Sequence, residues 1–286
     1  MLETRRKSEK RAQIGKPTNR ALFAAFRFLG LFHTAISLAI TSFLLYYIPM
    51  KPSLSLKTPE NTDELKTLYA QNQLVYYTPL EELINSASHA AGAVFALIFM
   101  VFMLLASTSP AQYATAFTAC FLIAVEFAVS AIYHGVSDMK AKLVWRKIDF
   151  PAVNLNVIAC ATATCLLYEQ VYGYVALGIS FFIAVTMFVL CAWRFDIFRK
   201  VSVASTFVIG GLMFAAFFTA LFSQYGIRES TGIIYGAGLA SCLLGAAIFG
   251  VHKRYVHCLF HFFVLVGPVL FLIATYLQIL SFNHIG

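Results

Sequence analysis

The sequence predicts an all-α integral membrane protein: a polytopic bundle of seven membrane-spanning helices with one additional apolar helix near the N-terminus. Hydrophobic residues make up 60% of the 286 residues and charged residues only 12%, against about 45–50% and about 25% in soluble domains. The apolar residues gather in runs of about 20, which is the length of a helix that spans hydrocarbon. No short alternating segments of the kind that form membrane β-strands are visible. Water-soluble, disordered and fibrous proteins are therefore excluded.

Three segments precede the predicted bundle. Residues 1–20 carry seven basic residues against two Glu, which predicts a basic, disordered tail in the cytoplasm or on the membrane surface. Residues 21–49 form the additional apolar helix, and residues 50–80 are a polar linker with three prolines. A single crossing by 21–49 would invert the orientation of all later spans. The segment therefore lies in the interface or re-enters, crosses with its tail exported, or is a cleaved signal.

Residues 81–286 form the seven-span domain. Its apolar runs are each 19 to 24 residues long, and their connections are short, which predicts one compact unit. We place the spans at residues 88–106, 111–134, 149–168, 172–193, 201–223, 231–250 and 257–280. Six cysteines are scattered without a CxxC pair, which indicates buried small side chains and not a disulfide framework.

The distribution of charge predicts the orientation of this domain. The connections before the third, fifth and seventh spans carry four, three and two basic residues, whereas the opposite connections carry only Arg228. Because basic loops stay on the cytoplasmic side, the domain should begin in the cytoplasm and place its C-terminus on the opposite side. The net charge of +8 thus indicates how the domain is oriented in the membrane. We expect a lipid bilayer as its partner and no nucleic acid.

Polar side chains inside membrane spans are costly and mark functional sites. Nine such residues form four groups: Glu82, Asn85 and His89; Glu126, Ser130 and His134; Asp149; and His257 and His261. Each group also has an ordinary explanation. These are a capping network at a helix start, an interfacial histidine, charge compensation at a helix N-terminus and two core histidines.

Topology favours a shared site over these separate explanations. The first, third and seventh spans run in one direction and the second in the other, so the four groups meet at the basic, cytoplasmic face. His-x3-His spacing lets His257 and His261 bind one metal ion together. Three histidines from two helices form a site with one open position, and three protein ligands plus water are typical of catalytic zinc. Asp149 can then bond this water or a ligand imidazole, and Ser130 can orient the same water.

At these residues the chain resembles the progestin and adipoQ receptor family, which includes the adiponectin receptors and the bacterial hemolysin III-like proteins. The resemblance covers about residues 80–280. It rests on Asp149 after a basic loop and on the segments ELINSASH (82–89), SAIYH (130–134) and HCLFH (257–261). It implies that His134, His257 and His261 bind Zn²⁺, with Ser130 and Asp149 close to the bound water. Glu126 departs from the family pattern.

The resemblance also bears on function, because the wider superfamily includes alkaline ceramidases. It implies a zinc-dependent hydrolase that cleaves an amide or ester of a membrane lipid. One alternative is a receptor or regulatory membrane protein with structural zinc, whose protein ligand the sequence does not name. A closed coordination shell with a fourth protein ligand would favour this alternative. The other is a pore-forming hemolysin, whose lysis would survive loss of the three histidines. The seventh span holds no Lys, which excludes a retinal Schiff base.

Overall fold

The computed structural model describes residues 62–221, 227, 229–251 and 253–285. The predicted basic tail (1–20) and the predicted additional apolar helix (21–49) lie outside the described residues. All of the described residues belong to one compact unit of the chain, which lies within Pro49–Gly286.

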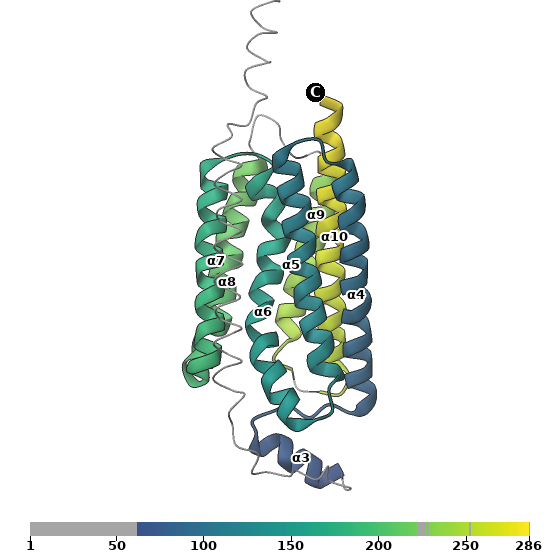
Figure 1. The fold of residues 1–286 in the computed structure, drawn as a ribbon, viewed down its shortest axis with the longest axis vertical. Coiled ribbons are helices and arrows are strands. Elements are labelled where there is room, and N and C mark those ends of the chain that lie inside the picture. Colours follow the sequence, from purple (N-terminus) through teal and green to yellow (C-terminus); the bar gives the residue numbers. More distant parts are fainter. Residues whose placement is uncertain (1–61, 222–226, 228, 252, 286) are drawn as a thin grey trace, which may run out of the picture. The chain divides into compact units, whose positions relative to one another are not determined.

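The described residues form eight α-helices and no strand (Figure 1). The helices are α3 (Thr62–Gln71), α4 (Pro79–Ala106), α5 (Pro110–Gly135), α6 (Met139–Leu166), α7 (Val171–Trp193), α8 (Phe195–Leu221), α9 (Glu229–Ile248) and α10 (Val256–Ile285). Within this part of the chain, the seven helices α4 to α10 are long and apolar enough to cross a membrane. The prediction of a helical membrane protein with seven spans is therefore confirmed.

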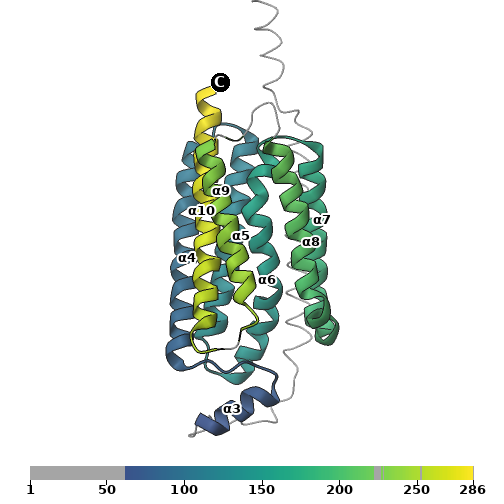
Figure 2. The same ribbon diagram turned by 180° about the vertical axis from the view of Figure 1, so that it is seen from behind.

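The seven long helices alternate in direction, because only short connections join them. Each of α4 to α7 packs against the next helix in the chain, and α10 packs against both α9 and α4. Helix α6 also contacts α8 and α10, so it occupies the interior of the bundle. Figures 1 and 2 show α7 and α8 on one side of α6 and α4 and α10 on the other. Small residues allow α9 to approach α10 closely, since a Cβ on Gly238 would lie only 3.1 Å from the carbonyl oxygen of Gly267.

Three helices begin earlier than the sequence predicts. Helices α4, α6 and α8 begin at Pro79, Met139 and Phe195, whereas hydropathy placed the starts of these spans at 88, 149 and 201. Helix α6 starts after the N-cap Asp138, whose carboxylate accepts a hydrogen bond of 2.8 Å from the backbone of Ala141. The backbone ladder then continues through the basic segment. Hydropathy marks where side chains become apolar, and a helix can begin before that point with its long basic side chains reaching polar surroundings.

The linker before α4 is bound to one end of the bundle. It contains α3, which lies beside this end in Figures 1 and 2, and we call it the α3 end. Tyr69 and Leu74 pack on Met139 at the start of α6. The buried Arg146 donates hydrogen bonds of 3.2 and 3.0 Å to the backbone carbonyls of residues 72 and 73. Helices α4, α6 and α10 begin at the α3 end, and α5 ends there.

Candidate metal centre

Three imidazoles converge at the α3 end of the bundle. His134 lies in the last turn of α5, and His257 and His261 lie one turn apart in the first turns of α10. One ligand atom from each side chain can be chosen so that all three lie within 4.8 Å of one another. His134 and His261 are buried and His257 is partly buried. Three neutral imidazole nitrogens at this spacing are suited to one transition-metal ion, so this histidine cluster can hold a metal.

Two residues of α4 contact the histidine cluster. Oε2 of Glu82 lies 2.6 Å from Nδ1 of His134, and Nε2 of His89 lies 2.7 Å from Nδ1 of His261. On the other side of the His261 ring, its Nε2 lies 3.0 Å from Nε2 of His257. The structure therefore places Glu82 and His89 next to the histidine cluster, each against a different histidine.

A buried lysine joins this network. Lys142 of α6 is 1% exposed, and its Nζ lies 2.6 Å from Oε1 of Glu82. It also donates hydrogen bonds to the carbonyl oxygens of Tyr133 (3.2 Å) and Val136 (3.3 Å) at the end of α5. In the sequence, Lys142 stands out only as one charge of a basic loop. Its position seven residues before Asp149, on the same face of a helix, was the available signal. That signal was missed because hydropathy placed the start of the helix after Lys142.

Asp149 and Ser130 lie beside His134. The Asp149 side chain on α6 hydrogen-bonds the hydroxyl of Ser130 on α5, and it interacts electrostatically with His134 and Lys142. Ser130 is buried, whereas Asp149 retains partial exposure. A carboxyl and a hydroxyl from two different helices are thus positioned near the histidine cluster.

Asn85 and Glu126 differ in their surroundings. Asn85 lies on α4 between Glu82 and His89 and is fully buried, and within the described part of the chain its amide nitrogen and oxygen have no hydrogen-bond partner. Glu126 lies deeper in α5 and accepts a hydrogen bond of 3.0 Å from Asn156 of α6. Glu126 therefore pairs with a polar group on a neighbouring helix.

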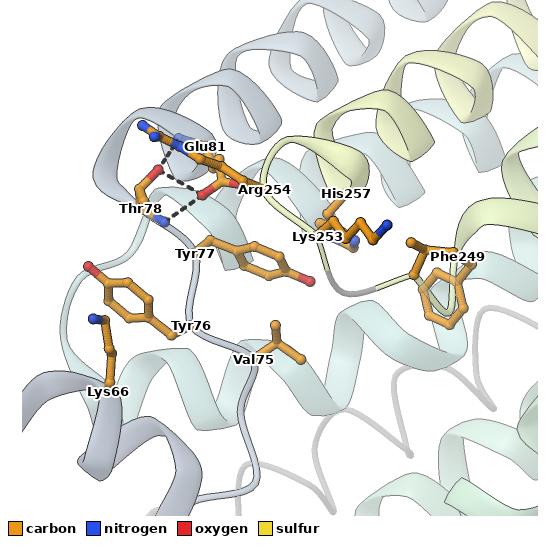
Figure 3. A pocket seen from close by; sticks show the side chains of 11 residues that line it. Lys66, Val75, Tyr76, Tyr77, Thr78, Glu81, Phe249, Lys253, Arg254 and His257 are labelled. Atoms are coloured by element: carbon orange, nitrogen blue, oxygen red, sulfur yellow. Dashed lines mark hydrogen bonds between the residues drawn. The ribbon is translucent and has the colours of Figure 1, made fainter. Parts of the chain in front are cut away.

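An aromatic side chain from the linker covers the histidine cluster. The Tyr77 ring stacks on His257, with ring centroids 4.5 Å apart and an angle of 17° between the ring planes. A cavity of about 300 Å³ opens beside these two residues, between the linker and the start of α10 (Figure 3). Burial, with the nearby carboxylates of Glu82 and Glu81, raises the pKa of the Tyr77 phenol above its ordinary value. Its hydroxyl is therefore neutral at physiological pH. No apolar run or motif in the sequence pointed to Tyr77.

Comparison with known protein families finds a match over the region of the chain that contains the histidine cluster. A family model described as Haemolysin-III related matches residues 77–272. The match begins at Tyr77 and includes all four groups of polar residues considered above. No solved structure matches the chain.

Proposed function

Since the chain belongs to the Haemolysin-III related family, we propose that it is a zinc-dependent membrane hydrolase that cleaves an amide or ester bond of a lipid. The observation that carries this proposal is the convergence of three imidazoles from two helices, with ligand atoms within 4.8 Å of one another. An all-histidine donor set suits zinc. Three protein ligands leave a position for water or substrate, which is the arrangement of catalytic zinc sites.

The residues around the cluster have distinct roles in this proposal. His134, His257 and His261 would hold the metal. When bound, zinc would polarise a carbonyl group and lower the pKa of a water molecule, so that this water could lose a proton and attack the carbonyl near neutral pH. The carboxylate of Asp149 accepts the proton that the attacking water loses and returns it to the nitrogen or oxygen of the leaving group. The hydroxyl of Ser130 orients that carboxylate through the hydrogen bond between them.

The position of the cluster in the bundle supports a lipid as the substrate. The histidines lie in the last turn of α5 and the first turns of α10, near the boundary between hydrocarbon and headgroups. The amide and ester bonds of membrane lipids lie at this depth. Asn85, buried and without a partner for its amide among the described residues, is available to bind a carbonyl or hydroxyl group of the lipid. The positive-inside rule assigns this face to the cytoplasm and the C-terminus to the opposite side.

The decisive experiment combines metal analysis with a lipid turnover assay on the purified full chain. We expect one zinc per chain and depletion of one lipid class from a cellular lipid extract. His257→Ala should lose both properties. Leu259→Ala, an exposed residue between the two α10 histidines, should keep both. A wild-type chain without stoichiometric zinc would reject the proposal.

Two alternative functions predict different results, one in this experiment and one in a separate lysis assay. Because the cluster connects α5 with α10, a structural metal would fasten these two helices together. Stoichiometric zinc without turnover of any lipid would favour this role, in a receptor or regulator. A pore-forming haemolysin would lyse cells whether or not His134 is present, so lysis by a His134→Ala chain would favour that function.

A further inference from the structure

Two of the three histidines in the cluster are contacted from the same helix. Glu82 and His89 are seven residues apart on α4, which places them two turns apart on one face. Each lies against Nδ1 of a different imidazole, at 2.6 Å for His134 and 2.7 Å for His261. Helix α4 itself contributes no residue to the cluster.

We infer that α4 positions the metal ligands, with Glu82 setting the tautomer and orientation of His134 and His89 those of His261. This inference rests on the metal-binding part of the proposed function and not on hydrolysis. A neutral imidazole carries one N–H, and an ionised carboxylate only accepts hydrogen bonds. Nδ1 of His134 therefore donates to Glu82, and its Nε2 lone pair is left for a metal. Partners of this kind on the second ring nitrogen fix the orientation and increase the basicity of metal-bound histidines.

The geometry of His261 leads to the same conclusion. Its Nδ1 faces Nε2 of His89, and its own Nε2 lies 3.0 Å from Nε2 of His257. If Nδ1 of His261 donates to His89, the Nε2 lone pairs of His261 and His257 can both be directed at one cation. His89 is 1% exposed, and its ring packs against Phe127 with centroids 4.8 Å apart. Packing therefore fixes the orientation of the His89 ring, with its Nε2 directed at His261.

Glu82 is held in place from two directions. Its Oε1 lies 2.6 Å from Nζ of Lys142. Lys142 in turn donates to the carbonyl oxygens of Tyr133, in the last turn of α5, and of Val136, the residue that follows the helix. The contacts thus form a closed ring of interactions: the end of α5 binds Lys142 of α6, Lys142 binds Glu82 of α4, and Glu82 contacts His134 of α5. Both carboxylate oxygens of Glu82 are engaged in this ring, so Glu82 orients a ligand and does not compete for the metal.

The test measures Zn²⁺ affinity of the purified full chain by competition with a chromophoric chelator. His89→Gln places a carbonyl oxygen near the position of the original Nε2, whereas His89→Asn is too short to reach Nδ1 of His261. We expect His89→Asn to weaken Zn²⁺ binding by about 10- to 100-fold and His89→Gln to restore most of the affinity. The d–d spectrum of bound Co²⁺ should change in His89→Asn and return in His89→Gln.

Glu82 is tested together with its ion-pair partner, because a single change would leave one buried charge unpaired. The double variant Glu82→Met/Lys142→Met should also weaken Zn²⁺ binding by about 10- to 100-fold. Ser88→Ala is the matched control, since Ser88 lies on α4 and, among the described residues, bonds only a carbonyl of its own helix, at 3.0 Å. Its affinity for Zn²⁺ should equal that of the wild type.

Several results would overturn the inference. Wild-type affinity in His89→Asn or in the double variant would do so, as would a His89→Gln chain that binds as weakly as His89→Asn. If a variant does not fold, the tautomers of His134 and His261 are determined instead by ¹⁵N NMR of the histidine-labelled wild-type chain. The resonances of His134 and His261 must then show protonation at Nδ1, and protonation at Nε2 in either would refute the inference. A wild-type chain that binds Zn²⁺ but hydrolyses no lipid would reject the hydrolase alone and leave this inference standing.

Discussion

Replacement of Lys142 by Met is expected to destabilise the protein strongly, although lysines in basic connections usually tolerate substitution. The Lys142 side chain is 2% exposed and its partner Glu82 15% exposed. Removing one member of a buried ion pair costs about 3–5 kcal/mol. Water at the partly exposed Glu82 reduces this cost, whereas the two carbonyls of α5 that lose their donor add about 1 kcal/mol. We therefore expect the free energy of unfolding to fall by about 3 kcal/mol.

The assay is thermal unfolding of the purified chain in detergent, followed with a thiol-reactive dye. Four of the six free cysteines are buried in the bundle and become reactive only on unfolding: Cys120, Cys160, Cys165 and Cys191. For a chain of this size about 1 kcal/mol corresponds to about 2–4 °C in Tm, so Lys142→Met should lower the apparent Tm by about 6–12 °C. Lys140→Met, an exposed position in the same turn region, is the control and should leave the Tm unchanged.

Two results would refute this reasoning. The first is an apparent Tm for Lys142→Met that equals that of Lys140→Met. The second concerns Glu82→Met/Lys142→Met, which removes both charges and should recover much of the lost stability. If this double variant melts at or below the temperature of Lys142→Met, the unpaired carboxylate is not the cause of the destabilisation.

Three further outcomes are expected. Gly173→Ala in α7 would place a Cβ 2.6 Å from a backbone carbonyl oxygen of α6, so unfolding should become easier by about 1–3 kcal/mol. Gly178→Ala on the same helix meets nothing within 4 Å and should not lower the Tm. Asn283→Ala removes three hydrogen bonds of 2.7 to 3.0 Å that join α10 to the end of α4, the α4–α5 connection and the start of α5. A loss of about 1–3 kcal/mol should appear in the same melting assay. Zn²⁺ at a thousand times its Kd should stabilise the wild type by about 4 kcal/mol. A chelator should abolish this gain, and His261→Ala should show none.

The amino-acid sequence by itself determined the seven spans of the bundle and the end of the bundle at which the polar groups meet. Both result from one-dimensional patterns. The length of an apolar run decides whether a helix can cross hydrocarbon, and short connections force successive helices to alternate in direction. The His-x3-His spacing of His257 and His261 likewise places two imidazoles on one face of any helix that contains them.

Only the tertiary structure decided which polar side chains are partners. Lys140 and Lys142 are equivalent in the sequence, yet one is exposed and the other is buried against Glu82. Glu126 and Ser130 lie on one stripe of α5, yet they bond to different residues of α6. The physical reason is that a hydrogen-bond partner depends on the rotation of each helix about its own axis and on its distance from its neighbours. Those quantities result from the packing of all the helices together, and no local pattern of residues encodes them.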